Sequence, residues 1–410
     1  MKSELNNIIL SGYSNNKQTQ NLINALESND VLVKILLASD DSGFIKKDNL
    51  ITIFHSDLNN ADKFINVKSM DPKAVAFLAP NYSIILRAMS RWDESVLNLD
   101  DKIFLIDTLF NHFCDLIKKH SIKTILFGTG SPHHFYNLVL TYSSKYLNVG
   151  NVFPITNWVT NRVRYVLNNT NNTIPVLGIG GDNGKMNDYL TNLIQTNKLV
   201  SFDSQRIYND KSTKNYLLFF IKHLFFKILG RLKHIITKQK DLYINDTGPV
   251  FYIVLTFLRK SLFSQYFKVV FKRKYNKNIS KTNPKNSIIF YAQNQPEATS
   301  HPDGGFYPDK RYWYYFFKKL GKKIYYKEHN ANFVHHQDGW IIDTYHHRSF
   351  SYLDFFLKRN VELLPVDYST RKLLENNNNI FTFSGTVILE SIINGKAAYF
   401  CGKSWHGDFP

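Results

Sequence analysis

The sequence predicts an α/β protein in which strands and helices alternate in two separate regions. In the first 130 residues, short apolar runs are separated by segments of helical spacing. After residue 286, similar runs are each followed by a polar or small-residue loop. The chain has 410 residues, of which 43% are hydrophobic and 15% aromatic, enough to bury the cores of two or more domains.

Four strands and two helices are predicted in the first region. The strands are expected at residues 7–10, 31–38, 50–54 and 124–127, and the helices at 17–26 and 101–120. The turn after the first strand, residues 11–15, has no G-x-G-x-x-G pattern. A dinucleotide is therefore not predicted, and we expect no cofactor.

A loop with glycines and histidines follows the fourth strand. It runs from Gly128 to His134 and is expected to open another helix. At the carboxyl end of a strand, His133 is a candidate acid/base or acceptor-binding group. An equally simple interpretation is a helix cap with exposed histidines.

Near the end of the chain, a strand, a tight turn and a helix are predicted in succession. The strand is expected at 380–383, the turn is Ser384-Gly385-Thr386, and the helix spans 387–393. Such a turn directs backbone N–H groups and the positive end of a helix dipole to one point, where a phosphate can bind. Glu390, one helical turn further on, would accept hydrogen bonds from ribose hydroxyls. The alternative is an ordinary capping turn with a solvated glutamate.

The triplet Lys327-Glu328-His329 follows a strand predicted at 323–326. At the carboxyl end of a strand, His329 can donate to a phosphate or sugar oxygen, and Lys327 can neutralise its charge. The alternative is a surface ion pair beside a structural histidine.

A third polar loop follows a strand predicted at 287–291. It contains Gln295-Pro296-Glu297 and leads into Gly304-Gly305, which suits a polyhydroxylated ligand, although a long connector would have the same composition. Loops that leave the same edge of a sheet converge in space. The three loops together therefore predict one ligand site.

With these motifs, the sequence resembles the capsule polysaccharide biosynthesis family of bacterial glycosyltransferases. This group contains Kdo transferases and is related to bacterial sialyl- and polysialyltransferases. The resemblance rests on residues 295–299 with Gly304-Gly305, on 327–329, and on 384–386 with Glu390, Gly395-Lys396 and Gly402. In that family the second motif usually ends in His-Pro, whereas Asn330 follows His329 here.

The resemblance implies a GT-B fold, in which two Rossmann-like domains face each other across a cleft. We accordingly expect an N-terminal acceptor domain at 1–205, a basic helical connector at 206–285 and a C-terminal nucleotide-sugar-binding domain at 286–410. GT-B proteins usually continue past the nucleotide site with helices that pack back on the first domain. Because the chain stops at Pro410, shortly after a predicted strand, we expect a shortened or truncated C-terminus.

The same resemblance implies roles for the motif residues. Ser384, Gly385 and Thr386 would hold the donor phosphate. His329 would assist them, and Glu390 would contact the ribose or the base. Glu297 would lie near the transferred sugar.

The chemistry expected of such a site is a metal-independent transfer. No Asp-x-Asp triplet occurs in the sequence, which argues against a metal-dependent glycosyltransferase of the single-domain type, and no metal ligands are predicted. Charge on the leaving phosphate would be met by a helix N-terminus, His329 and Lys327. The resemblance favours a CMP-activated donor, such as CMP-Kdo or CMP-sialic acid. Glu297 and His133 are the candidate catalytic residues.

The positive charge of the chain is concentrated in one segment. The net charge is +18, and residues 214–285 hold sixteen Lys or Arg against two Asp, which accounts for +14 of it. Basic positions recur there at helical spacing, with apolar and aromatic residues between them: His223, Lys227, Arg231, His234 and Lys238. This pattern predicts a basic amphipathic helix that binds an anionic membrane surface through Lys227, Arg231 and Lys238. Packing of the helix on its own domain is the alternative.

The remaining composition bears on compartment and partners. The chain has two cysteines, its first residues lack the apolar segment of a signal peptide, and no apolar run approaches the roughly 20 residues that span a bilayer. We expect a cytoplasmic protein, peripheral on the inner face of the plasma membrane. No nucleic-acid-binding module accompanies the basic residues, so nucleic acid is not predicted as a partner.

The predicted function is a glycosyltransferase of surface polysaccharide biosynthesis. It would transfer Kdo or another acidic sugar from a CMP-activated donor to a lipid-linked or growing glycan. The alternatives are a sugar-nucleotide epimerase of similar fold and a non-catalytic, membrane-associated capsule-assembly protein.

Overall fold

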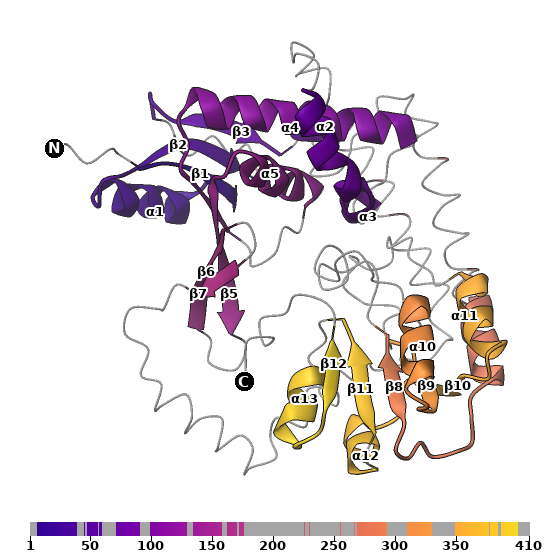
Figure 1. Cartoon of the computed structure of the whole chain (residues 1–410). Coiled ribbons are helices and arrows are strands. Elements are labelled where there is room, and N and C mark those ends of the chain that lie inside the picture. Colours follow the sequence, from indigo (N-terminus) through magenta and orange to yellow (C-terminus); the bar gives the residue numbers. More distant parts are fainter. Residues whose placement is uncertain are drawn as a thin grey trace. The chain divides into compact units, whose positions relative to one another are not determined.

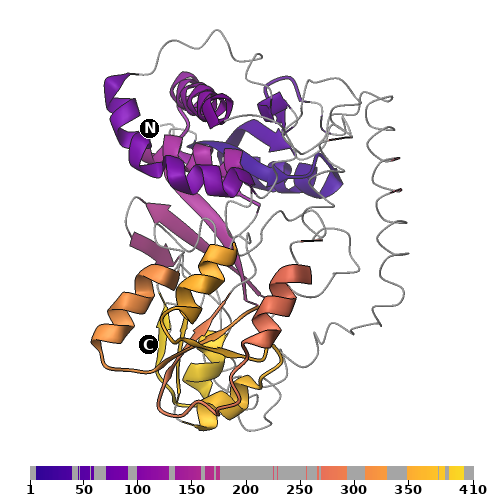
Figure 2. The ribbon, with the colours of Figure 1, turned by 90° about the vertical axis from the view of Figure 1, so that its right-hand side faces the viewer.

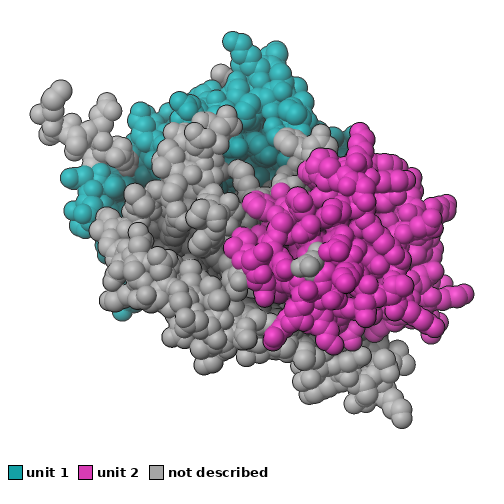
Figure 3. Space-filling view, turned by 60° about the horizontal axis from the view of Figure 1, so that its bottom comes forward, with its two compact units in different colours: residues 1–181, 233–253 teal, residues 182–232, 254–410 magenta. Residues whose placement is uncertain are grey.

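The computed structural model describes most of two α/β regions. The described residues are 6–38, 45, 47–55, 57–59, 71–90, 99–128, 134–157, 162–169, 172–175, 225, 229, 255, 266, 269–292, 310–329, 349–376, 378–383 and 387–400. The chain divides into two compact units: unit 1 comprises residues 1–181 and 233–253, and unit 2 comprises residues 182–232 and 254–410 (Figure 3). Each unit is described by itself below.

Unit 1 is built on a seven-stranded sheet in the order β3-β2-β1-β4-β5-β6-β7. The strands from β3 to β5 in this order are parallel, and β6 and β7 continue the sheet in antiparallel pairing (Figure 1). Their bounds are β1 Asn6–Tyr13, β2 Val31–Ala38, β3 Ile51–Phe54, β4 Thr124–Phe127, β5 Gly150–Asn157, β6 Arg162–Asn169 and β7 Asn172–Pro175.

Two of the helices in unit 1 begin at side-chain caps. The helices are α1 Lys17–Glu27, α2 Pro72–Leu78, α3 Tyr82–Ser90, α4 Leu99–Lys119 and α5 Phe135–Tyr146. The side chain of Asn16 accepts a hydrogen bond from the Thr19 N–H at 3.0 Å and so caps α1. Asp71 caps α2 in the same way, and Pro72 occupies the first helical position, where its missing N–H has no cost.

Alternating residues of β1 serve two hydrophobic cores. Ile9 belongs to a large cluster with residues of α3, α4 and α5. Ile8 and Leu10 point to the opposite face, where they pack with Ile23 of α1. The parallel part of the sheet is therefore covered on both faces, as parallel sheets generally are.

Unit 2 contains a five-stranded parallel sheet in the order β10-β9-β8-β11-β12, and Figure 1 shows these strands side by side. The strands are β8 Ile288–Tyr291, β9 Ile324–Lys327, β10 Glu362–Leu364, β11 Asn379–Thr382 and β12 Ala398–Phe400. The helices are α10 Lys310–Lys319, α11 Phe350–Leu357, α12 Thr370–Glu375 and α13 Val387–Ile393, together with a helix at 269–277.

The two faces of this sheet carry different helices. On one face, Phe290, Tyr326 and Phe381 pack with residues of α10, α11 and the helix at 269–277, which stands beside the sheet in Figure 2. On the other face, Ile289 and Ile380 pack with residues of α12 and α13. We refer to these as the α10/α11 face and the α12/α13 face.

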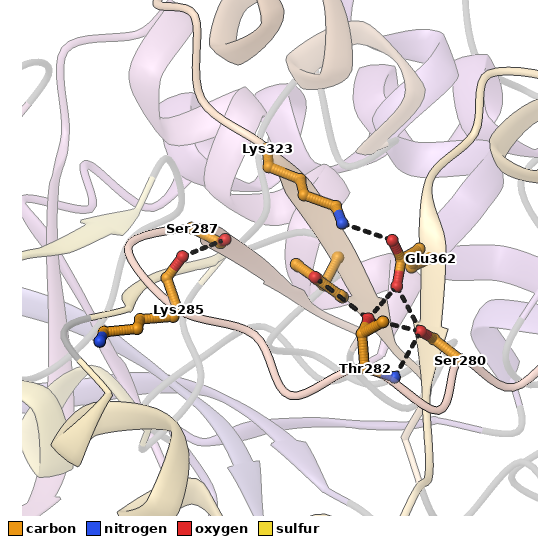
Figure 4. A network of polar contacts seen from close by, with 7 residues as sticks. Ser280, Thr282, Lys285, Ser287, Lys323 and Glu362 are labelled. Carbon is orange, nitrogen blue, oxygen red and sulfur yellow. Dashed lines mark hydrogen bonds and ion pairs between the residues drawn. The ribbon is translucent and has the colours of Figure 1, made fainter.

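A polar network closes the amino end of the unit 2 sheet (Figure 4). The Glu362 carboxylate accepts hydrogen bonds from the hydroxyls of Ser280 and Thr282 and pairs with the Lys323 ammonium at 2.5 Å. The Thr282 N–H donates to the Ser280 hydroxyl at 3.1 Å. The network holds the segment before β8 against the first residues of β9 and β10, at the end of the sheet opposite the polar motifs.

The structure confirms the predicted α/β class with two sheets. The strands predicted in the first region are β1 to β4, and those predicted in the last third are β8, β9 and β11. Strands β5, β6 and β7 were not predicted, and they make the first sheet partly antiparallel. The arrangement of two domains across a cleft and the boundaries 1–205, 206–285 and 286–410 remain predictions.

Candidate functional site

The strands that precede the three polar motifs are neighbours in the unit 2 sheet. Strand β8 lies between β9 and β11, with Tyr291 in register with Lys327 and Phe290 in register with Phe381. Since all three strands are parallel, their carboxyl ends lie at one edge of the sheet. This carboxyl edge is where open parallel sheets bind ligands.

Part of each motif lies outside the described residues. Glu297 follows β8, and Ser384, Gly385 and Thr386 connect β11 to α13; none of these four is described. The described members of the predicted site are Lys327, His329 and Glu390.

Lys327 is the last residue of β9, and its side chain is buried. Its ammonium nitrogen lies 4.9 Å from the centroid of the Tyr291 ring at the end of β8. The Tyr291 hydroxyl donates to Oγ1 of Thr370 at 3.0 Å, which fixes the ring. A lysine charge is thus held against an aromatic face at the carboxyl edge.

Glu328 is also buried, so the triplet is not the surface ion pair that was the alternative interpretation. Its Oε2 accepts the Tyr326 hydroxyl at 2.6 Å, and its Oε1 accepts the His329 N–H at 2.8 Å. These bonds fix the backbone at the point where the chain leaves β9. The His329 side chain, only partly buried, is therefore carried by a rigid segment.

A tyrosine distant in sequence completes this arrangement. The Tyr275 hydroxyl donates to the Leu364 carbonyl at 2.6 Å and accepts the Glu328 N–H at 3.1 Å. Burial raises the pKa of Tyr275 well above its usual value, so the hydroxyl keeps the proton that it donates. Tyr275 thus joins the carboxyl ends of β9 and β10. No sequence signal identified it, because it lies 53 residues before Glu328 in the basic segment.

Lys310 is a second lysine in this part of the molecule, and it belongs to none of the three sequence motifs. It is the first residue of α10, and only 1% of its surface is exposed. Its ammonium nitrogen lies 3.8 Å from the centroid of the Phe383 ring, and Phe383 immediately precedes Ser384. Lys310, Tyr314 and Phe317 are spaced by four and three residues and are all buried, so helical periodicity was the signal that would have identified it.

The strand and the helix predicted on either side of residues 384–386 are confirmed, and the turn between them lies outside the described residues. Strand β11 ends at Thr382, and α13 begins at Val387. Glu390 lies in the first turn of α13 and is partly buried. This position agrees with the predicted one, and its role toward a ribose remains a prediction.

In unit 1, the loop predicted to contain an acid/base group leads into α5. His133 lies outside the described residues, whereas His134 occupies the N-cap position of α5 and makes no side-chain capping hydrogen bond. The His134 ring stacks on Tyr136, with centroids 5.2 Å apart and planes 6° apart.

The Tyr136 hydroxyl in turn lies 2.5 Å from Nδ1 of His55, a buried residue that directly follows β3. Burial lowers the pKa of His55 to about 4, against an opposing hydrogen bond with the Leu37 backbone. Burial also raises the pKa of Tyr136 well above its usual value. At neutral pH the tyrosine is therefore the donor and a neutral His55 the acceptor. No sequence signal places His55 beside the start of α5, because the two are far apart in the chain.

Two glycines bring the ends of β1 and β4 together in unit 1. Gly12 has φ of +81°, and a Cβ at Gly128 would lie 2.7 Å from the Gly12 carbonyl oxygen. Residues 11–13, which the sequence predicted to be part of a turn, belong to β1, and glycine at 12 and 128 allows the close backbone approach between the neighbouring strands.

The predicted membrane contacts Lys227, Arg231 and Lys238 lie outside the described residues. Between residues 223 and 238 the structure describes Phe225 and Leu229; both are helical, and they are 58% and 44% exposed. Among the described residues, no helix combines the length and the apolar character needed to cross a membrane. In the same described set, no group of three or more metal-ligating side chains was found.

Comparisons with known proteins identify no family. No family model matches the sequence, and neither does any curated protein. Among solved structures, the chain is similar to Thermosulfurimonas dismutans KpsC, a beta Kdo 2,4 transferase, with 10% identity, 70% of this chain and 71% of that chain covered, and a TM-score of 0.27. It is also similar to UDP-GlcNAc 2-epimerase from Neisseria meningitidis, with 10% identity, 96% and 81% coverage and a TM-score of 0.20. With both TM-scores below 0.5, neither likeness indicates a function for this chain.

Proposed function

We propose that this chain is a GT-B glycosyltransferase of surface polysaccharide biosynthesis. It transfers Kdo or another acidic sugar from a CMP-activated donor to a lipid-linked or growing glycan. The observation that carries the proposal is the adjacency of β8, β9 and β11, because the three polar motifs leave the same carboxyl edge from these strands. Adjacent strand ends of a parallel sheet are the usual place for a nucleotide.

The donor phosphate is assigned to three groups of residues. Lys327 supplies a positive charge held near the edge by Tyr291. His329 donates to a phosphate oxygen from a backbone fixed by Glu328. The Ser384-Gly385-Thr386 turn offers backbone N–H groups, and Glu390 accepts hydrogen bonds from the ribose.

Transfer breaks the bond between the anomeric carbon and the phosphate oxygen and forms one to an acceptor hydroxyl. The electron pair of the broken bond leaves with CMP, where Lys327 and His329 stabilise the added charge. The acceptor proton passes to a general base, a role for which Glu297 and His133 are the candidates. In this proposed mechanism, fixed protein groups thus stabilise the negative charge that develops on the leaving phosphate.

Calorimetric titration with CMP, UDP and GDP tests the donor site. We expect the wild type to bind CMP most tightly and a His329→Ala, Ser384→Ala double variant to lose that binding. Ser351→Ala, an exposed position on α11, is the matched control and should bind as the wild type does. A folded wild-type protein that binds no nucleotide would contradict the proposal.

Turnover separates the transferase from the two alternatives. A transferase releases CMP from the donor sugar only when a glycan acceptor is added. An epimerase interconverts its sugar nucleotide without an acceptor, and a non-catalytic assembly protein shows neither reaction. Chromatography of a CMP-sugar incubated with and without acceptor glycan distinguishes the three outcomes.

We also propose that the basic segment holds the enzyme at the cytoplasmic face of an anionic membrane. The exposed Phe225 and Leu229, spaced by one helical turn, support this role, because an interfacial helix needs outward apolar side chains. Each lysine or arginine near an anionic surface contributes about 1 kcal/mol.

Cosedimentation with vesicles tests this location. Neutralising Lys227, Arg231 and Lys238 to Gln should reduce binding to phosphatidylglycerol vesicles. The control neutralises Lys277, Lys281 and Lys285, three exposed lysines of the same segment. Equal loss in both triple variants would indicate a general charge effect and not a dedicated helix.

A further inference from the structure

We propose that Lys310 binds the donor phosphate, as a second cation at the carboxyl edge of the unit 2 sheet. This inference rests on the proposed function, because it names a further residue of the same nucleotide site. Neither the sequence motifs nor the family resemblance assigned a role to Lys310.

The first observation is burial of a charge at a defined place. Lys310 is 1% exposed, and lysine is among the side chains that are almost never fully buried. Removing an ammonium group from water is unfavourable, so a buried lysine needs favourable interactions of its charge to offset that cost. Lys310 is the first residue of α10, whose other end is at Lys319.

The second observation is the aromatic neighbour. The ammonium nitrogen lies 3.8 Å from the Phe383 ring centroid and 6.0 Å from that of Phe381. Phe381 lies in β11 and Phe383 directly follows it, and Phe383 is itself 1% exposed. The rings hold the ammonium group beside Phe383, the residue that precedes Ser384 in the sequence.

Two lysines consequently reach the same edge from opposite faces of the sheet. Phe383 belongs to the cluster of the α10/α11 face, whereas Tyr291, which contacts Lys327, belongs to the cluster of the α12/α13 face. Strands β8 and β11 are neighbours; Tyr291 is the last residue of β8, and Phe383 is the first residue after β11. A phosphate bound over these two strand ends would be approached by one ammonium from each face.

A purely structural role for Lys310 predicts different variant behaviour. Lys310→Met keeps an unbranched apolar stem of similar length and removes only the charge. Lys310→Arg keeps the charge. If the residue serves packing alone, the methionine variant should bind ligand as the wild type does.

The test is calorimetry with CMP and with cytidine, which differ by the phosphate. For Lys310→Met we expect CMP binding to weaken by about tenfold or more and cytidine binding to stay unchanged. Lys310→Arg should retain most of the CMP affinity. Equal CMP affinity in the wild type and Lys310→Met would overturn the inference while leaving the proposed function intact.

Lys318→Met is the matched control. Lys318 lies at the other end of α10, is exposed, and also places its ammonium near a ring, 5.7 Å from the Tyr314 centroid. Its replacement should not change CMP binding. A similar loss in both variants would mean that general charge is responsible and would overturn a specific role for Lys310.

A second measurement covers the other outcomes. Pyrophosphate should raise the thermal midpoint of the wild type and Lys318→Met but not of Lys310→Met. If no nucleotide binds but pyrophosphate shifts the three thermal midpoints as expected, the proposed function is contradicted and the anion site at Lys310 is supported. If pyrophosphate has no effect either, both fail. Should Lys310→Met not fold, Lys310→Gln replaces it in the same two experiments.

Discussion

The hydroxyl of Tyr275 accepts the backbone N–H of Glu328 at 3.1 Å and donates to the carbonyl of Leu364 at 2.6 Å. One buried side chain from the helix at 269–277 therefore joins the ends of β9 and β10. The Glu328 carboxylate in turn accepts a hydrogen bond from the His329 N–H. Tyr275 is therefore connected through Glu328 to His329, a residue of the proposed site.

Tyr275→Phe removes both hydrogen bonds and leaves two buried backbone groups without this partner. We expect a loss of about 2–4 kcal/mol in the free energy of unfolding, since each buried unsatisfied group is worth about 1–3 kcal/mol. Urea denaturation measures this loss. Hydrogen exchange should accelerate first in the peptides that contain β9 and β10. Tyr312→Phe, at an exposed position on α10, is the control, and an equal loss there would contradict the assignment.

Glu362 gives the amino end of the same sheet a defined acid sensitivity. Burial by itself would raise its pKa, but hydrogen bonds from Lys323, Ser280 and Thr282 lower it to about 2 (Figure 4). A carboxyl group whose pKa is lower in the folded state stabilises the protein above its unfolded value, near 4.5, and loses that contribution as the pH falls toward 2.

Glu362→Gln should therefore flatten the dependence of stability on pH between 4.5 and 2 and leave the dependence above pH 5 unchanged. Chemical denaturation at a series of pH values measures it. The control is Glu375→Gln, whose carboxylate pairs with Arg371 at an exposed position on α12. If the free energy of unfolding of Glu362→Gln falls between pH 4.5 and 2 as steeply as that of the wild type, Glu362 does not contribute to the pH dependence of stability.

The strands that position the site were predictable because their residues repeat at short range. The apolar runs at β8, β9 and β11 and the polar residues after each of them are visible in the sequence, and the parallel pairing brings them to one edge. The contacts that hold the site were not predictable, because they join distant segments. Tyr275 reaches Glu328 across 53 residues, and His55 reaches Tyr136 across 81.

The burial of Lys310 was not predictable for a different reason. A lysine at the start of a helix is ordinarily solvated, so its residue type indicates an exposed position. Its spacing from Tyr314 and Phe317 instead places it on the buried side of α10. Strands β6 and β7 carry polar residues such as Asn168 and Asn172, which are poor strand formers on propensity alone. Their pairing with each other and with β5 prevails over that propensity.

Asn378 shows that an asparagine-rich run can contain a structural residue. Its Oδ1 accepts the Ser287 N–H at 3.0 Å, and its Nδ2 donates to the carbonyls of Pro284 and Leu373 at 3.0 and 2.8 Å. The side chain is fully buried between the starts of β8 and β11.

Asn378→Ala leaves these three backbone groups without their side-chain partner. We expect a loss of about 2–4 kcal/mol in the free energy of unfolding. Asn376→Ala, in the same run but only partly buried, should lose less than about 1 kcal/mol. Urea denaturation compares the two variants. Equal effects would mean that composition, and not this hydrogen-bond set, determines the contribution of the run.

His55 predicts a second pH dependence, in a different pH range. Its pKa is about 4 in the folded protein and near 6.5 when unfolded, because burial disfavours the charged ring. Between these values the unfolded chain binds a proton that the folded chain does not, so stability falls as the pH drops from 6.5 to 4. The slope from this one residue is at most about 1.4 kcal/mol per pH unit, or about 3 kcal/mol over the range.

His55→Asn removes the titrating ring and keeps a group that can accept the Tyr136 hydroxyl. We expect the variant to be less stable than the wild type at pH 7 and to have a shallower decline between pH 6.5 and 4. The measurement is urea denaturation at half-unit pH steps, with NMR of the imidazole protons to follow His55 directly in the wild type. A His55 resonance that titrates near pH 6.5 in the folded protein would show that the ring is solvated, and the predicted slope difference would then vanish.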